Sequence, residues 1–145
     1  MYAEVASDMS DWRNTPINDS KKFINLEQSF LSQLEQYQET FANQNKYILK
    51  EKMKLSADSL LSCNPNKISL ELTNEGSIFY TLIKNDIKIY FQHFLIDEFD
   101  DSDEAIISVF KGDQNLLNYG GSLHNALSKL GKALEQYQVR LIQFA

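Results

Sequence analysis

The chain has few of the residues that break or cross-link a fold. Its 145 residues include five glycines, two prolines and one cysteine. So little glycine and proline argues against a disordered or low-complexity chain. The single cysteine, Cys63, excludes an internal disulfide and is typical of a protein from a reducing compartment. A chain of this length buries roughly two-thirds of its unfolded surface, so it can fold without a disulfide or a metal.

Long apolar runs and a surplus of basic charge are also missing. No run approaches the roughly 18 apolar residues that span a bilayer, and residues 1–8 lack the basic start and apolar core of a signal peptide. We therefore expect a cytoplasmic protein. The formal net charge of −6 disfavours direct binding of a nucleic-acid backbone or of an anionic membrane surface.

The negative charge is concentrated in residues 97–104. This acidic segment holds six of the 20 acidic residues and no base, so the other 14 balance the 14 lysines and arginines. It has no glycine and does not match an EF-hand calcium loop. Such a run is most often a solvated connection, but it also suits recognition of a basic surface on a protein partner. The candidate partner-binding acids are Asp97, Asp100, Asp101 and Asp103, and neutralising them is expected to weaken binding while leaving stability almost unchanged.

The N-terminal part of the chain divides into an arm and a helix. Residues 1–19 are polar and have no sustained apolar period, which predicts a flexible arm. Trp12, the only tryptophan, either folds back on the core or anchors a partner. Residues 20–62 predict one long helix that ends before Pro65. Its apolar side chains recur mostly at spacings of three and four and form one stripe, with two later members at a spacing of seven: Phe23, Leu26, Phe30, Leu34, Tyr37, Phe41, Ile48 and Leu55.

A single helix over residues 20–62 is too long for a small sheet to cover. It would measure about 60 Å at about 1.5 Å per residue, against roughly 17–20 Å for an ordinary strand. The apolar stripe must therefore pack on a second helix, fold back at the Asn-rich residues 43–45, or meet another chain. The last alternative makes Phe30 and Tyr37 candidate partner-binding residues.

Residues 67–119 predict an antiparallel β-meander of four or five strands. Apolar and polar side chains alternate, as in Lys67–Leu72, which is the period of a half-buried strand. Turn residues follow at positions 74–76, 85–86 and 112–113. Connections this short join antiparallel neighbours.

A second helix is predicted at the C-terminal end. Gly120 and Gly121 are expected to turn the chain out of the sheet, and Ser122 is expected to cap a helix over residues 122–141. The predicted fold is therefore α+β, with a long N-terminal helix, a meander and a C-terminal helix in one domain over residues 20–145.

The third predicted strand, residues 87–96, has one apolar face and one mixed face with two aromatic residues. Alternate positions that include His93 form the predicted core face. The opposite face carries Tyr90 and Phe94, and the second strand adds aromatic residues. Either a helix covers this second face, or it is an aromatic patch that binds a partner. Two helices in one chain favour coverage.

No catalytic or metal-binding motif stands out. Cys63 with His93 or His124 would supply a nucleophile and a base, but Cys63 lies near a helix C-terminus, where the helix dipole disfavours a thiolate. His93 alternates with core residues and is expected to be a satisfied, partly buried histidine. We therefore expect no enzyme, no cofactor and no metal.

The function that these observations favour is a non-catalytic protein-binding module. Such a module would be a small adaptor, inhibitor or immunity-type protein that acts on a larger protein. The first alternative is a structural homo-oligomer assembled through the long N-terminal helix. The second is a small ligand-binding domain or enzyme that uses the sheet face near Tyr90, His93 and His124.

Overall fold

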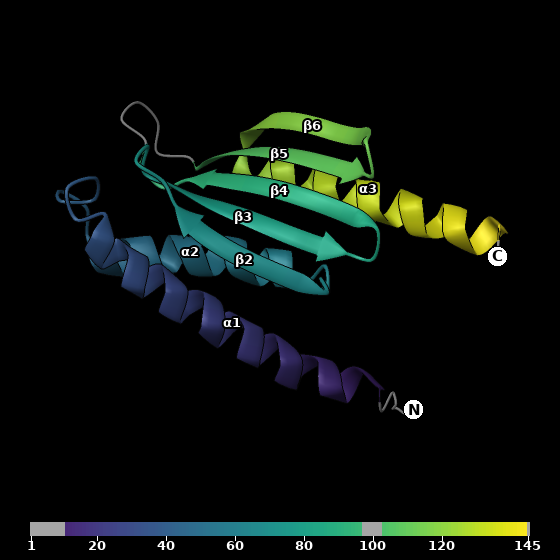
Figure 1. Cartoon of the computed structure of the whole chain (residues 1–145), viewed down its shortest axis with the longest axis horizontal. Coiled ribbons are helices and arrows are strands. Elements are labelled where there is room, and N and C mark those ends of the chain that lie inside the picture. The colour runs from purple at the N-terminus through teal and green to yellow at the C-terminus, as the bar shows by residue number, and fades with distance from the viewer. Residues whose placement is uncertain (1–10, 97–102, 145) are drawn as a thin grey trace.

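The computed structural model describes the backbone of residues 11–96 and 103–144 and the side chains of residues 20–96 and 103–136. Within these residues, helices at both ends of the chain enclose a run of strands (Figure 1). This arrangement confirms the α+β class. The elements, in chain order, are α1 (Asp11–Gln36), α2 (Lys46–Leu61), β2 (Lys67–Leu72), β3 (Ser77–Lys84), β4 (Ile87–Phe94), β5 (Glu104–Lys111), β6 (Gln114–Ser122) and α3 (Leu123–Phe144).

The strands form one antiparallel sheet in the order β2-β3-β4-β5-β6. Each strand pairs with its neighbour in sequence, which confirms the predicted meander. The turns use residues that accept a left-handed backbone, such as Asn85 with φ of 56° and Gly76 with φ of 79°. The predicted turn at Gly120 and Gly121 is wrong, because β6 continues through both. A side chain at Gly121 would meet the Tyr119 ring, since its Cβ would lie 2.5 Å from Tyr119 Oη.

The single long helix predicted over residues 20–62 is wrong, because the chain folds back within it. Helix α1 ends at Gln36 and α2 begins at Lys46. The Asn45 side chain caps α2 by accepting hydrogen bonds from the N–H groups of Tyr47 (2.8 Å) and Ile48 (3.2 Å). Of the three expected outcomes for the apolar stripe, the chain therefore takes the fold-back at the Asn-rich residues.

The start of the first helix also differs from the prediction. Helix α1 begins at Asp11, inside the predicted arm, so a start at Ser20 is too late. Residues 1–10 of the predicted arm lie outside the described residues. At the other end of the chain the C-terminal helix is confirmed, and the Ser122 hydroxyl caps it by accepting a hydrogen bond from the Asn125 N–H (3.2 Å).

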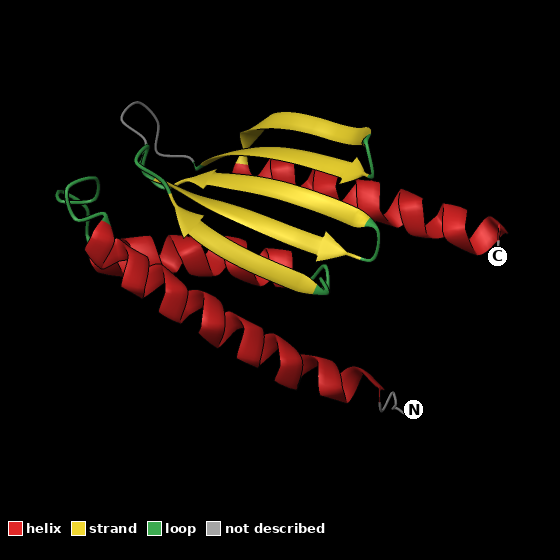
Figure 2. Cartoon of the chain, viewed as in Figure 1, coloured by secondary structure: helices red, strands yellow, loops and turns green. Residues whose placement is uncertain are grey.

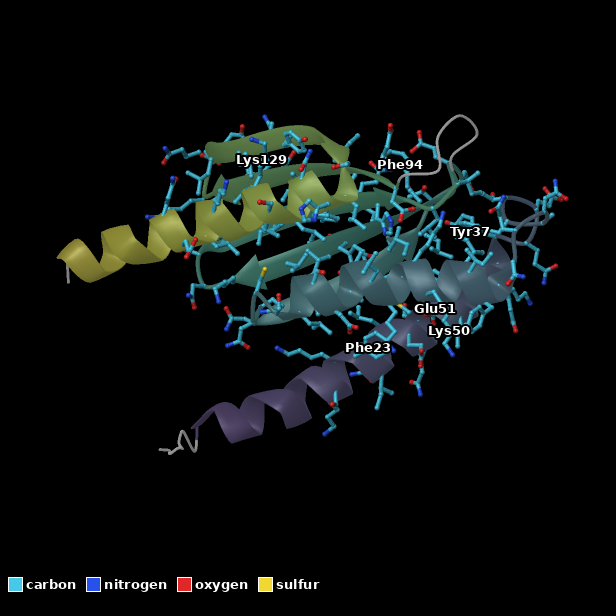
Figure 3. The ribbon with its side chains drawn as sticks, turned by 180° about the vertical axis from the view of Figure 1, so that it is seen from behind. Phe23, Tyr37, Lys50, Glu51, Phe94 and Lys129 are labelled. Atoms are coloured by element: carbon cyan, nitrogen blue, oxygen red, sulfur yellow. The ribbon has the colours of Figure 1, made fainter. Side chains whose placement is uncertain are left out.

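The core lies between the sheet and the helices α2 and α3. Both helices lie behind the sheet in Figure 1 and in front of it in Figure 3, which views the molecule from the opposite side. Helix α1 runs along β2 and packs on β2 and α2 (Figure 2). The core face predicted for β4 is confirmed, since its alternate side chains and Leu95 are buried: Ile87, Ile89, Phe91, His93 and Leu95.

The apolar stripe of α1 is part of this core, but it does not continue into α2. Leu26, Phe30, Leu34 and Phe41 are buried together. Ile48 and Leu55, the predicted continuation, are more than half exposed. The turn between the helices resets the helical phase, so α2 buries another set of side chains that includes Leu49, Met53 and Leu60.

Candidate functional site

The sheet face opposite α2 and α3 carries no helix of the described residues. We call it the open face, and Figure 1 shows it toward the viewer. The expectation that a helix covers this face is therefore wrong for the described part of the chain. The physical reason is that α1 packs along the β2 edge and both remaining helices share one face of the sheet.

Three aromatic rings lie across the middle of the open face. They are Phe79 from β3, Tyr90 from β4 and Phe110 from β5, and each ring is half-buried. The centroids of Phe79 and Tyr90 are 5.8 Å apart, and those of Tyr90 and Phe110 are 6.0 Å apart in an edge-on arrangement. Neighbouring rings at such distances attract each other. We call these residues the aromatic cluster.

The cross-strand register explains why Tyr90 lies at the centre. Its partners are Thr81 on β3 and Ser108 on β5. Both are small, so the Tyr90 ring has room to reach the larger diagonal neighbours Phe79 and Phe110. On β5, Ile106 shares the open face and is 47% exposed, so the apolar surface extends beyond the aromatic cluster.

A shallow depression of about 430 Å³ lies where the open face meets the β3–β4 turn. Its apolar lining includes Ile83, Tyr90 and Phe110. Lys88 adds a positive charge, with Nζ 5.8 Å from the centre of the Tyr90 ring. The lining contains no serine, cysteine or histidine. Asp86 adds a negative charge to the same lining, so the shape and chemistry of the depression suit an apolar side chain next to a polar group.

On the covered face of the sheet, a polar cluster is buried under α2. His93 Nδ1 lies 3.0 Å from Ser56 Oγ, and Ser56 Oγ lies 2.8 Å from the Tyr80 hydroxyl. His93 Nε2 points toward Asp103 Oδ1 at 3.7 Å, longer than a hydrogen bond, and Lys52 Nζ lies 3.3 Å from the same oxygen. Burial raises the pKa of the Tyr80 hydroxyl, although its bond with Ser56 opposes the shift, so Tyr80 stays neutral.

The buried polar cluster has the residue types of a hydrolytic triad but not its access. Ser56 and His93 are both 0% exposed, so no substrate reaches the hydroxyl. The Ser56 hydroxyl already contacts His93 and Tyr80 and donates to the Met53 carbonyl at 3.2 Å. The cluster therefore ties α2 to the sheet. His93 is fully buried, not partly buried as predicted.

Sequence reasoning missed Ser56 and Phe110. It also grouped Tyr80 with Phe79 on the second face of the sheet, but Tyr80 is buried on the covered face. Ser56 has a signal, since it falls among the apolar positions of the buried side of α2. Phe110 is placed on the open face only by the register of β4 with β5, in which it pairs with Lys88.

The predicted partner-binding residues separate into several groups in the structure. Tyr90 and Phe94 are half-buried on the open face, where Phe94 pairs with Ser77 and Glu104 at one end. Phe30 is buried in the core and Tyr37 packs against the core beside the turn between the helices (Figure 3). The Trp12 side chain and the acids Asp97, Asp100 and Asp101 lie outside the described residues.

The Asp103 carboxylate lies beside Lys52 and His93, so it is not a solvated acid of a connecting loop. The adjacent His93 ring, followed by the charge of Lys52, holds the pKa of the Asp103 carboxyl below its ordinary value, although burial opposes this shift. The Asp103 carbonyl also accepts a hydrogen bond from the Leu123 N–H at 3.0 Å. The expectation that neutralising the acidic segment leaves stability unchanged therefore does not extend to Asp103.

We predict that Asp103→Asn reduces the loss of unfolding free energy that occurs as the pH falls below about 4. The unfolded chain has the ordinary carboxyl pKa of 3.8 and the folded chain a lower one. The stabilisation by Asp103 is therefore fully present above about pH 4 and is lost as the pH falls through the folded value. Urea unfolding followed by circular dichroism between about pH 5 and pH 2 should show a smaller loss for Asp103→Asn than for the wild type. The exposed turn variant Asp113→Asn is the control, and equal losses for Asp103→Asn and wild type would contradict the prediction.

The surroundings of Cys63 do not favour a reactive thiolate. Burial raises the pKa of its thiol, although the charge of Lys84 opposes this shift. A thiol with a raised pKa is a poor nucleophile.

The described residues form neither a metal-binding cluster nor a membrane-spanning helix. No group of three or more His, Cys, Asp and Glu side chains there is placed to hold a metal ion. No helix there is long and apolar enough to cross a membrane. No protein-family model matches the chain, and neither the curated proteins nor the solved structures contain a match.

Proposed function

We propose that this protein is a non-catalytic protein-binding module that binds a larger protein through the open face of its sheet. The observation that carries this proposal is the aromatic cluster of Phe79, Tyr90 and Phe110 on a face without a helix. An antiparallel sheet commonly leaves one face wet, but that face is then polar. Contiguous apolar surface on the wet face is typical of an interaction site.

The geometry of the aromatic cluster also suits tight binding. Each ring is held by its neighbour on the next strand, so little side-chain freedom remains to be lost on association. Tyrosine is enriched among the few residues that dominate interface energies, because it combines a large apolar surface with a hydroxyl. The depression beside Tyr90 and Phe110 supports a partner that inserts an apolar side chain there.

Electrostatics adds a second property of the partner. The acidic segment, residues 97–104, contains six acidic residues and joins the ends of β4 and β5 that carry Phe94 and Glu104. The depression lies at the opposite end of these strands, where Ile87 pairs with Lys111. The two locations support a partner with a basic surface at one end of its contact and an apolar protrusion at the other, and such charge complementarity speeds association. We propose that the module acts as a small adaptor, inhibitor or immunity-type protein. We also propose a cytoplasmic location, on the evidence of the lone Cys63.

The two alternative functions have less support than partner binding through the open face. A homo-oligomer assembled through the N-terminal helix needs a free apolar stripe, and Phe30 and its neighbours are buried in their own core. A ligand-binding or catalytic role on the sheet face needs an enclosed pocket, whereas the depression on the open face is shallow.

We predict that Tyr90→Ala weakens partner binding by about 30-fold or more, because truncating an interface anchor costs about 2 kcal/mol or more. Full-length protein is used to capture proteins from the native host, and each captured protein is then purified and its affinity measured by calorimetry. Tyr47→Ala is the matched control, since Tyr47 is 71% exposed on α2, away from the open face. Circular dichroism confirms that both variants fold.

The comparison of the two tyrosine variants decides the proposal. A partner that loses affinity for Tyr90→Ala and keeps it for Tyr47→Ala supports binding through the open face. A partner that binds both variants as tightly as the wild type overturns it.

A further inference from the structure

The two edge strands of the sheet, β2 and β6, differ in whether a described element covers them. The β2 edge is covered by α1, and the Gln33 side chain pairs with it as a neighbouring strand would. Gln33 Nε2 donates to the Leu70 carbonyl at 3.0 Å, and the Leu72 N–H donates to Gln33 Oε1 at 2.7 Å. Two outward backbone groups of β2, the Leu70 carbonyl and the Leu72 N–H, are therefore bonded within the chain.

The β6 edge has no comparable cover among the described residues. In Figures 1 and 2 no described element lies beyond β6. Its sequence, Gln114–Ser122, contains no charged residue and no proline. Charges, prolines and β-bulges are the usual means by which proteins prevent an edge strand from pairing with another chain. The register shift of β6 lies opposite Val109 and Phe110, outside residues 118–122. The side chains of Asn115 and Asn118 bond to each other and Asn115 bonds to the Val109 carbonyl on β5, so they turn inward.

The pairing of β5 with β6 identifies the backbone groups that face outward. The Leu123 N–H donates to the Asp103 carbonyl just beyond the paired strands. Because bonded and non-bonded pairs alternate in an antiparallel ladder, Gly121 and Tyr119 also bond to β5. The positions between them, Asn118, Gly120 and Ser122, therefore direct their N–H and C=O groups away from the sheet.

We infer that β6 pairs with β6 of a second copy of this chain, antiparallel and about a two-fold axis at Gly120. A copy turned about that axis places Gly120 opposite Gly120 and Asn118 opposite Ser122. Every outward N–H then meets a C=O, the facing side chains are uncharged, and the large Tyr119 faces Gly121, which has no side chain. Two chains of net charge −6 thus meet on a strand where no like charges oppose each other.

The structure also explains why this assembly stops at two copies. Pairing through β6 uses the one edge that is bare among the described residues, and α1 with Gln33 blocks the β2 edge. A two-fold axis normal to the sheet keeps α2 and α3 of both copies on one side. The result is a closed dimer with a continuous sheet and two adjacent open faces, whereas two bare edges would give an open fibre.

Amide hydrogen exchange and solution mass test the inference on the full chain. The N–H groups of Asn118, Gly120 and Ser122 should become protected as concentration rises, while those of Tyr119 and Gly121 are protected throughout. Light scattering should show the mass rising from 16.7 kDa toward twice that value. Gly120→Pro removes an outward N–H without touching the β5 ladder, so its mass should stay at 16.7 kDa at every concentration.

A charge variant with a matched control gives an independent readout. Asn118→Lys places a charge on β6, and Ser69→Lys places the same charge in the same row of the sheet on the covered β2 edge. The dimer should weaken for Asn118→Lys and persist for Ser69→Lys. A protein that stays monomeric at all concentrations would overturn the inference. The same holds if the β6 amides become protected only when a strand-forming peptide is added, because the edge then binds another chain and not its own copy. A dimer that survives both Gly120→Pro and Asn118→Lys would overturn it too, since its interface lies elsewhere.

Discussion

Replacing Phe30 by alanine is expected to lower the free energy of unfolding by about 3–5 kcal/mol, the usual range for a buried phenylalanine. Phe30 is 0% exposed and packs in the core with Leu26 and Leu34 of its own helix. The substitution removes the ring and leaves a cavity that the surrounding sheet and helices fill only in part. Urea unfolding followed by circular dichroism measures the change.

The neighbouring residue provides the control for this experiment. Leu31→Ala changes a side chain that is 42% exposed one position along the same helix, so it should cost much less than Phe30→Ala. The contrast also distinguishes a core residue from the partner-binding residue that the sequence suggested. If Phe30→Ala is as mild as Leu31→Ala, then α1 does not pack as described and its stripe is free for another chain.

Replacing Ser56 by alanine is expected to cost about 1–3 kcal/mol, although the substitution removes a single oxygen atom. The reason is that a buried polar group left without a partner bears its full desolvation penalty. Without the Ser56 hydroxyl, His93 Nδ1 loses its contact at 3.0 Å and the Tyr80 hydroxyl retains only the Met53 carbonyl at 3.4 Å. Unfolding by urea at neutral pH measures the loss.

Ser59→Ala is the matched control on the same helix. The Ser59 hydroxyl donates to the Leu55 carbonyl at 3.0 Å near the surface, where water replaces the lost partner. We expect its stability to change by about 0.5 kcal/mol or less. Equal effects of the two variants would mean that the buried polar cluster does not link α2 to the sheet.

The position of Tyr90 in the candidate site was predictable, because it depends on the two-residue alternation of side chains along one strand. The alternation along β4 places Tyr90 on the face opposite His93, since successive side chains of a strand point to opposite faces. The same rule gave the meander, because short turns leave antiparallel pairing as the natural outcome. The missing member of the aromatic cluster, Phe110, depends on how β5 aligns with β4, and that register is not a local property.

Other predictions failed because they extended a local pattern across a tertiary event. The sequence predicts that the apolar stripe from Phe23 to Phe41 continues to Leu55. The fold-back at Asn45 starts a new helix, in which a different set of side chains is buried. Asp103 was grouped with its acidic neighbours along the sequence. In space it is the partner of Lys52 and His93, which come from α2 and β4.

The sequence by itself determined the α+β class and the order of the strands, because periodicity and turn residues act over a few positions. Only the tertiary structure decided that α2 and α3 share one sheet face, that the aromatic cluster lies on the other, and that α1 covers the β2 edge while no described element covers β6. The physical reason is that coverage is a relation between surfaces distant in sequence. Each helix has an apolar side that needs burial, but the sheet offers two faces and two edges, and only the packing of the whole chain selects among them.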